Sequence, residues 1–288
     1  MLGLGTSITS PYLADAGYVN SHSVALGGSG DFFDTNTTLQ SQIRNSFTIS
    51  AWIKLDDGTP SAVQYIAGAS KASNVIGFAV QTTGKLSAVH QANGDIALYN
   101  VDAATFTNGA TDWTHVALKV TETGGNTAYN IYVDGEEVAA TLVFAVSISN
   151  HNNYTSDINL GFGALQNGAG SATTAIDGFI DECAFFDAAL EDSEISAIGG
   201  GGAPTDITGH DHLHLYYKMN NSTDDEAGDH ADKVDFILNH FVDTAKNPKR
   251  VMLKFDDSLP ASLSSYDSYT ESEVQAMQSD SSSDWYLG

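Results

Sequence analysis

The stretch FTISAWIKL, residues 47–55, decides the fold class of this chain. Apolar side chains occupy every second position, and polar or amphipathic side chains fall between them: Phe47, Ile49, Ala51, Ile53 and Leu55 against Thr48, Ser50, Trp52 and Lys54. Side chains of a strand alternate between the two faces of a sheet, whereas a helix repeats every 3.6 residues or so. The stretch therefore predicts a β-strand with one face in a hydrophobic core.

The same alternation continues outward from this strand. The segment WTHVALKV, residues 113–120, places Val116, Leu118 and Val120 on one face. In YNIYVDGEEV, residues 129–138, Asp134-Gly135 supplies the dipeptide that a tight hairpin turn favours. Short strand-like runs separated by Gly, Asn and Asp recur from about residue 20 to 187, a spacing typical of β-sandwiches. We therefore predict an all-β, antiparallel sandwich.

The composition of the chain limits the kinds of partner that it can bind. The 288 residues carry 11 Lys and Arg against 36 Asp and Glu, a formal net charge of −25, which argues against nucleic acid or an anionic membrane surface as a ligand. No run of 18 or so apolar residues predicts a membrane span, and residues 1–17 lack the features of a secretory signal. Cys183 is the only cysteine, so no disulfide forms within the chain.

The stretch DGFIDECAFFDAAL, residues 177–190, raises a question about a carboxylate. At strand periodicity Asp181 shares a face with Phe179, Cys183 and Phe185, so we expect a carboxylate that points toward the core. An ionised carboxylate in an apolar interior needs a cation or several hydrogen-bond donors. After this strand, Asp187 is the expected cap of a short helix that ends at the glycines of residues 199–202.

The chain divides by composition into a central body and two flanking segments. From Pro248 onward it is rich in Ser and Asp, which predicts an extended arm with little core of its own. The expected domains are an N-terminal extension (1–19), a β-sandwich body (20–247) that includes a closing strand and helix (176–198), a glycine linker (199–202) and an additional strand region (203–247), and a C-terminal arm (248–288).

Five segments match, in order, the pattern of one family. They are SVALGGSGDFFD, SFTISAWIKL, WTHVALKV, YNIYVDGEEV and IDGFIDECAFFDAALEDSEISAI, at residues 23–34, 46–55, 113–120, 129–138 and 176–198. On these segments the chain resembles the laminin-G-like, concanavalin A-like jelly-roll domains, although Gly27 stands where that family more often has Asp. The resemblance implies two antiparallel sheets packed face to face, with one short helix after the closing strand.

The resemblance also implies a structural Ca²⁺ ion. In this family the ion has ligands from the early Gly-x-x-Asp loop and from the Asp of the closing strand, which correspond here to Asp31, backbone oxygens near Gly28, and Asp181. A cation there would neutralise Asp181. The alternative is that backbone N–H groups or Ser29 donate hydrogen bonds to Asp181 and no ion is bound.

Other polar clusters suggest weaker sites. His210, His212 and His214 share a face at strand spacing and would suit Zn²⁺ or Ni²⁺, but no fourth ligand is evident, so an exposed or intersubunit histidine face is the stronger interpretation. An acidic turn at Asp224, Asp225, Glu226 and Asp229 is interpreted as a solvated loop. Residues 136–137 fall in a hairpin and residues 191–194 in a helix, so neither forms the strand-borne carboxylate pair of a glycoside hydrolase, and we predict no enzymatic activity.

Glycan binding is a fair hypothesis for this fold. Such sites combine aromatic platforms with polar loops, and the candidate residues in predicted loops or strand ends are Tyr65, His90, Tyr99, Asn152, Asn153 and Tyr154. The alternative is that these are ordinary rim residues.

Three functions from different classes follow. The first is a non-enzymatic virion structural protein of a tailed bacteriophage, on the outer surface, which associates with itself and other virion proteins; it rests on similarity to laminin-G-like phage proteins, whose openings resemble LGLGTSIT. On this hypothesis the arm makes assembly contacts through Phe255, Tyr266, Trp285 and Tyr286. The second is a carbohydrate-binding or adhesive module, extracellular or on a bacterial cell surface. The third is a glycoside hydrolase.

Overall fold

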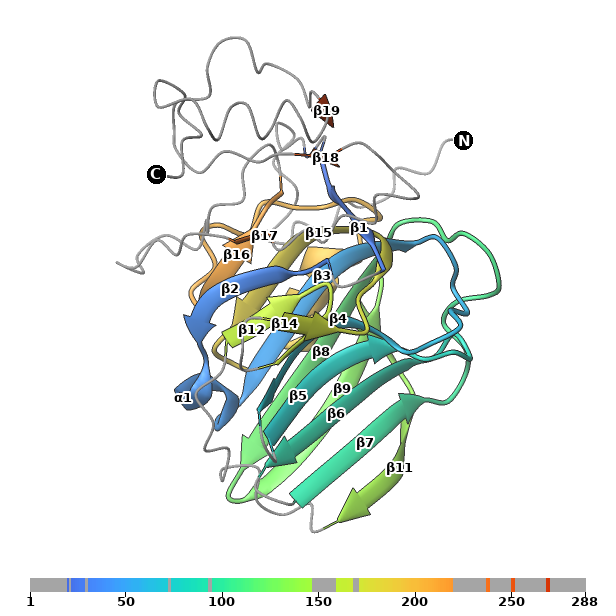
Figure 1. Cartoon of the computed structure of the whole chain (residues 1–288). Coiled ribbons are helices and arrows are strands. Elements are labelled where there is room, and N and C mark those ends of the chain that lie inside the picture. The colour runs from blue at the N-terminus through green and yellow to red at the C-terminus, as the bar shows by residue number, and fades with distance from the viewer. Residues whose placement is uncertain are drawn as a thin grey trace, which may run out of the picture. The chain divides into compact units, whose positions relative to one another are not determined.

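A computed structural model describes most of the predicted β body (Figure 1). The described residues are 20, 22–28, 31–71, 74–92, 95–146, 159–167, 171–219, 237–238, 250–251 and 268–269. Strands dominate them, in two large antiparallel sheets, which confirms the all-β sandwich.

The first sheet has seven strands and contains the stretch on which the prediction rests. Its order is β1-β15-β3-β8-β9-β10, with β16 also paired to β15. The bounds are β1 Val24–Gly27, β3 Phe47–Leu55, β8 Thr114–Thr123, β9 Asn126–Val133, β10 Glu136–Val138, β15 Asp177–Phe186 and β16 Leu213–Tyr217. Strands from both ends of the body, β1 and β15, are thus direct neighbours.

The second sheet has ten strands, in the order β11-β7-β6-β5-β4-β12-β2-β17, with β13 paired to β4 and to β14. The bounds are β2 Phe33–Thr38, β4 Gln64–Lys71, β5 Asn74–Val80, β6 Leu86–Ala92, β7 Asp95–Val101, β11 Ala140–Val146, β12 Asn159–Phe162, β13 Leu165–Asn167, β14 Ser171–Thr173 and β17 Ile237–Leu238. Strand β11 is therefore an edge of this sheet (Figure 1).

The main core lies between the inner faces of the two sheets. It includes all five apolar residues of the opening stretch and Val116, Leu118 and Val120 of β8, so the predicted alternation of both strands is confirmed. The hairpin prediction is also correct: Asp134 and Gly135 have φ values of 48° and 79°. These positive values fit a tight turn between β9 and β10.

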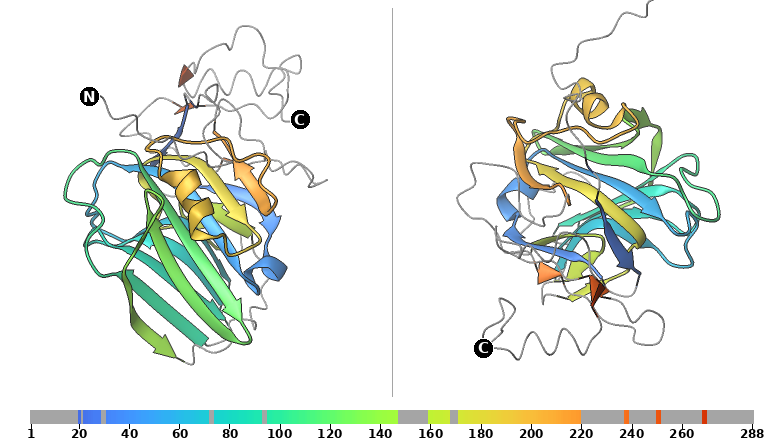
Figure 2. Two further views of the ribbon diagram at one scale, coloured as in Figure 1. Left: turned by 180° about the vertical axis from the view of Figure 1, so that it is seen from behind. Right: turned by 90° about the horizontal axis from the view of Figure 1, so that it is seen from above.

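A second, smaller core covers the outer face of the seven-stranded sheet. The helix α2, Asp192–Gly199, lies on this sheet (Figure 2). It buries Ile195 and Ile198 against Ala117 and Tyr132. The expected start of this helix at Asp187 was wrong. The N-cap is Glu191, because its side chain and that of Glu194 form a reciprocal capping box at the first turn. A one-turn helix, α1 Gln40–Ile43, was also not predicted.

The chain separates into two compact units, residues 1–239 and 240–288. In the second unit, β18 Arg250–Val251 pairs with β19 Ser268–Tyr269. The other residues of the predicted arm, including Phe255, Tyr266, Trp285 and Tyr286, lie outside the described residues, as does the predicted extension 1–19. None of the helices in the described part of the chain has the length and apolar character needed to cross a bilayer.

Candidate functional site

A bulge in the closing strand moves Asp181 away from the position that simple alternation gives it. The pairing of β15 with β3 shifts between Asp181 and Ala184, and Glu182 has a φ of 48°. Ile180, Cys183 and Phe185 belong to the main core, whereas Asp181 pairs with Trp52. The extra residue of a bulge reverses the alternation of the strand. The expectation that Asp181 shares the core face with Phe179, Cys183 and Phe185 was therefore wrong.

Four oxygens converge on the side-chain amide of Asn20. Its Nδ2 lies 3.0 Å from each carboxylate oxygen of Asp181 and 2.9 Å from the backbone carbonyl oxygen of Lys218. It also contacts Oε1 of Glu182. An amide group has two hydrogens, so it cannot donate a full hydrogen bond to four acceptors at once. We call these groups of Asn20, Asp181, Glu182 and Lys218 the oxygen cluster.

The oxygen cluster is buried and acidic. Asp181 is 6% and Glu182 4% exposed. The backbone N–H of Glu182 donates to Asp181 Oδ1 over 2.9 Å, and the Tyr216 hydroxyl donates to Glu182 Oε2. Burial, followed by the adjacent Glu182 carboxylate, raises the pKa of Asp181 to about 8. Without a cation the ionised form of Asp181 is thus disfavoured at neutral pH.

The donor set of the oxygen cluster suits a hard cation. Ca²⁺ binds carboxylate, carbonyl and amide oxygens at 2.3–2.6 Å or so, and turning the Asn20 amide would present its oxygen as a further ligand. No group of three or more His, Cys, Asp or Glu side chains suited to a metal ion occurs among the described residues. The oxygen cluster has two such side chains, and its other oxygens come from Lys218 and Asn20.

The structure does not bring Asp31 to Asp181. Asp31 Oδ2 accepts a hydrogen bond of 2.8 Å from the Gly27 N–H, and Gly27 pairs with Asp177 at the start of β15. Asp181 is four residues farther along that strand, or about 13 Å at the usual rise. Gly28, with a φ of 72°, also lies beside Asp177. The residues expected to share one ion therefore lie at two places along β15.

The three predicted histidines do not converge on one point. His210 lies 3.4 Å from Glu194, His212 lies 3.5 Å from Asp187, and His214 lies 3.3 Å from the amide of Gln42. Their partners come from three different segments. The acidic turn, residues 224–229, lies outside the described residues.

The outer face of the ten-stranded sheet carries a row of glycines. Gly161, Gly68 and Gly77 are direct cross-strand neighbours on β12, β4 and β5. The ring of Tyr65 lies on two of them, whereas Gly161 lies against Gln166: a Cβ added to Gly77 would lie 2.4 Å from Tyr65 Cε1, and one added to Gly68 would lie 3.2 Å from its Cδ1. Any larger residue at Gly77 would displace this ring. The glycines thus form a floor for an aromatic side chain.

Neutral polar groups lie on the same face as this aromatic, with Asn100 three strands away, or about 14 Å at the usual strand spacing. A row of cross-strand neighbours runs from Tyr65 on β4 through Ala79, Ser87 and Asn100 to Thr141 on β11. Asn100 Oδ1 is buried with no hydrogen-bond partner among the described residues. Gln166 lies over Gly161 and is 4% exposed. Its Oε1 is likewise buried with no hydrogen-bond partner among the described residues. We call Tyr65, its glycine floor, Asn100 and Gln166 the Tyr65 face.

The other predicted glycan ligands do not join the Tyr65 face. His90 is 1% exposed, and its Nδ1 lies 3.0 Å from the Tyr129 hydroxyl in the interior. Tyr99 packs on Tyr129 with ring centroids 5.0 Å apart. The side chain of His90 is therefore in the interior, and that of Tyr99 is partly buried against the main core, because both project from the inner side of their strands. Asn152, Asn153 and Tyr154 lie outside the described residues.

Ser50, Trp52 and His115 belong to two of the five segments that match the family pattern, and they lie together under α2. His115 Nε2 lies 2.8 Å from the Ser50 hydroxyl, and the rings of His115 and Trp52 are 5.6 Å apart. His115 is fully buried, and burial lowers its pKa to about 3, so the imidazole is neutral. Gly199 at the end of α2 lies directly against this ring. The cluster holds the helix to the sheet.

Two parts of these sites were not found from the sequence. Asn20 and the Lys218 carbonyl are far from Asp181 in the chain, and no spacing rule connects them. The glycine floor had a local signal: single glycines inside the apolar runs YIAGAS and VIGFAV. A glycine inside a strand often marks a close approach of another group.

The chain matches one family model and is similar to several solved structures. The family model described as "Concanavalin A-like lectin/glucanases superfamily" matches residues 27–196. A solved structure of a putative carbohydrate binding protein from Bacteroides ovatus is similar at 20% identity and a TM-score of 0.44, over 68% of this chain and 52% of that one, about half its length. The IT-sialidase CBM40 of Ruminococcus gnavus is similar at 14% identity and a TM-score of 0.46, over 62% and 97%.

A heptameric SAP-like pentraxin from Limulus polyphemus is also similar, at 14% identity and a TM-score of 0.43, over 65% of this chain and 85% of that one. No curated protein sequence matches this chain.

Proposed function

We propose that this chain, which belongs to the concanavalin A-like lectin/glucanase superfamily, is a non-catalytic glycan-binding protein that holds a saccharide on the Tyr65 face. The observation that carries the proposal is the Tyr65 ring held over Gly68 and Gly77, on a face that also carries Gln166 and Asn100, whose amide oxygens have no hydrogen-bond partner among the described residues. The sequence had suggested Tyr65 as a ligand, and the floor gives it a fixed position.

The chemistry of the Tyr65 face matches a saccharide. The apolar C–H face of a pyranose stacks on an aromatic ring, while its hydroxyl groups donate to and accept from amides. Val89 and Leu98 continue the glycine row on β6 and β7, so apolar surface extends beside the polar row. Asn100 Oδ1 is a buried acceptor with no hydrogen-bond partner among the described residues, and a sugar hydroxyl would reach it only after the amide turns outward.

The carboxylates support binding without hydrolysis. Glycoside hydrolysis needs two carboxyl groups that flank the scissile bond. Asp181 and Glu182 lie on the other sheet and are buried by Asn20 and Tyr216, where a polysaccharide would not reach them.

The substitution Tyr65→Ala is expected to weaken glycan binding by at least about tenfold, because it removes the stacking surface and leaves the sugar with polar contacts alone. Tyr65→Phe is expected to keep most of the affinity, since the ring remains. A glycan array followed by isothermal titration with the best glycan would measure both. The matched control is Trp113→Ala, because Trp113 is an exposed aromatic, at 38%, that pairs with Phe179 on the other sheet.

A glycan array without signal, with and without Ca²⁺, would contradict the proposal. So would a glycan that binds Tyr65→Ala as tightly as the original protein.

We also propose that the oxygen cluster holds a structural Ca²⁺ ion. The support is the convergence of Asp181, Glu182 and the Lys218 carbonyl on a single amide nitrogen. The ion would neutralise both carboxylates and tie β15 to the segment after β16 and to Asn20. This set of ligands replaces the pairing of Asp181 with Asp31 and Gly28 that the family pattern suggested.

A second candidate places this glycan-binding body on the outer surface of a bacteriophage virion. An exposed apolar edge strand, β11, favours it because structural proteins need subunit interfaces. Placement on a bacterial cell surface, as an adhesive module, is the competing assignment. A gene neighbourhood of capsid or tail genes supports the virion.

Deletion of residues 248–288 tests the virion role. We expect the shortened chain to remain folded and to lose incorporation into particles, because the proposed assembly contacts lie in that segment. Circular dichroism and co-sedimentation with virions measure the two properties. Normal incorporation of the shortened chain would contradict the assigned role of residues 248–288.

A further inference from the structure

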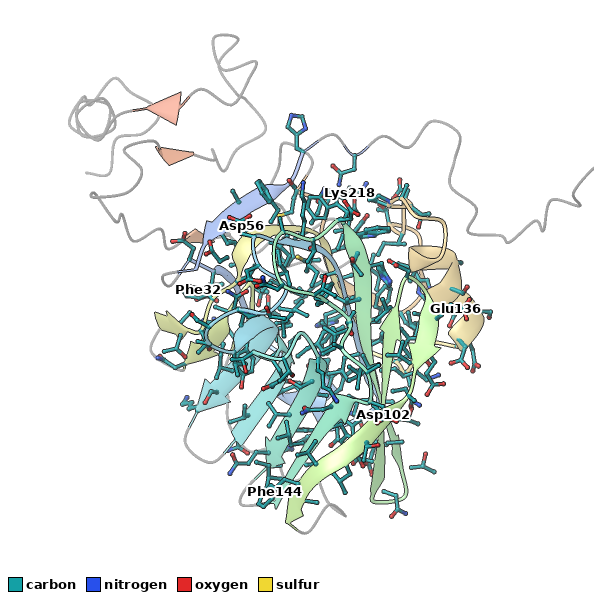
Figure 3. The ribbon with its side chains drawn as sticks, turned by 90° about the vertical axis from the view of Figure 1, so that its right-hand side faces the viewer. Phe32, Asp56, Asp102, Glu136, Phe144 and Lys218 are labelled. Carbon is teal, nitrogen blue, oxygen red and sulfur yellow. The ribbon has the colours of Figure 1, made fainter. Side chains whose placement is uncertain are left out.

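The edge strand β11 concentrates the exposed apolar side chains of the described residues. The described residues include four exposed large hydrophobic side chains. Three of them are consecutive in β11: Leu142 at 36%, Val143 at 56% and Phe144 at 52%. Figure 3 labels Phe144 on this strand. The fourth is Trp113. An edge strand also has backbone N–H and C=O groups that are not used by its own sheet.

The strand has few of the features that normally protect an edge: its own residues include no charged side chain and no Pro, although its pairing with β7 shifts at a bulge between Leu142 and Phe144. Natural edge strands carry Lys, Pro or inward charges that prevent pairing with another chain. Residues 138–156 contain no Asp, Glu, Lys, Arg or Pro. Asp102, which accepts a hydrogen bond of 2.6 Å from Thr141, is the acidic group seen at β11 in the described residues. Among the described residues β11 pairs with β7 alone, so its other edge is open to a partner strand.

We propose that β11 pairs with β11 of a second copy of this chain, antiparallel and about a two-fold axis, so that the two ten-stranded sheets become continuous. A strand pairs with its own copy at equal length, and each exposed apolar side chain meets apolar side chains of the partner. The proposal does not depend on glycan binding.

Charge favours a second copy at this place. Each chain carries a net charge of −25, so two copies repel one another over most of their surfaces. The strand β11, whose own residues carry no charge, is where two such chains can approach with the least repulsion. A basic partner, in contrast, would gain more by binding the acidic surface. Added salt is therefore expected to tighten the dimer, because it screens the repulsion between the bodies.

Sedimentation velocity of the full chain tests the proposal. We expect a species of twice 30.4 kDa that dissociates on dilution. Phe144→Glu is expected to raise the dimer dissociation constant by at least about tenfold, because each introduced carboxylate would then lie against apolar side chains of the partner strand. The matched control, Trp113→Glu, makes the same change in charge at an exposed aromatic away from β11 and should leave the constant unchanged.

Hydrogen exchange of the original protein gives a second readout that requires no variant. Amides of residues 140–146 should become protected as the protein concentration rises. A monomer at all concentrations up to about 100 µM would overturn the proposal, as would a dimer that Phe144→Glu does not weaken. Tyr65→Ala should leave the dimer intact, so failure of glycan binding and failure of pairing are distinguishable.

Discussion

Calcium added to the EDTA-treated chain is expected to raise the free energy of unfolding of the β body by about 2.7 kcal/mol when the ion is present at about 100 times its dissociation constant. The reason is that the oxygen cluster exists only in the folded chain, so the ion binds the folded state and not the unfolded one. For a body of this size the midpoint of thermal unfolding should rise by about 5–10 °C. Scanning calorimetry with and without Ca²⁺ measures the effect.

Three substitutions separate the oxygen cluster from the loop of Asp31. Asp181→Asn and Glu182→Gln keep the shape of each side chain, remove one anionic ligand, and should abolish most of the response to Ca²⁺. Asp31→Asn is the matched control, because Asp31 is also buried, at 3% exposed against 6% for Asp181, but lies near the start of β15. Loss of the response in Asp31→Asn alone would instead place the ion beside Gly28. Melting that is indifferent to both EDTA and Ca²⁺ would contradict any such ion.

The pH dependence of the free energy of unfolding, measured in EDTA, provides a second test of the ion at Asp181. Burial raises the pKa of Asp181 from 3.8 to about 8 in the folded chain. A carboxyl group whose pKa is raised by folding contributes stability that is fully present below the unfolded pKa and is lost as the pH rises through the folded one. The metal-free chain should therefore lose stability between about pH 4 and pH 8. Bound Ca²⁺ should remove this loss, and Asp181→Asn should remove it without Ca²⁺.

Local pattern and chain order were enough to predict the sandwich. The alternation in β3 and β8 and the Asp134-Gly135 turn are properties of neighbouring residues, and all were found as expected. The bulge at Glu182 was not predicted, because one extra residue has no signal in the composition of the strand. It nevertheless moves the side chains on one side of the bulge to the opposite face from the one that simple alternation predicts. Alternation therefore gave the correct strand and the wrong face for Asp181.

The sites could be predicted only in part, since they join residues that are distant in the chain. Tyr65 and Asp181 were identified as candidates, but their surroundings were not. Asn20 is separated from Asp181 by 161 positions, and only the pairing of β1 with β15 brings that part of the chain near the closing strand. His90 showed the opposite problem: a polar residue near a strand end was expected at the surface, and a hydrogen bond with Tyr129 allows it to be buried.

Gly199→Ala is the substitution expected to destabilise the described body most directly through packing. An added Cβ would lie 1.9 Å from His115 Nδ1 and 2.6 Å from Cε1, far inside van der Waals contact. The imidazole has little room to move, because it is fully buried and bonded to Ser50. We expect a loss of about 3 kcal/mol in the free energy of unfolding, measured by urea denaturation. The matched control is Gly201→Ala, where the nearest atom is 4.0 Å away, and its effect should stay within about 0.5 kcal/mol.

A double-mutant cycle with His115→Ala identifies the cause. If the clash with the imidazole is responsible, Gly199→Ala should cost much less in the His115→Ala background, because the small side chain leaves room for the new methyl group. Equal costs in both backgrounds would mean that the helix end tolerates no side chain for another reason, such as strain at the end of α2. The cycle also tests why the Trp-x-His-Val segment and the short helix occur together. Each is shaped to the other, since the histidine ring fills the space that Gly199 leaves open.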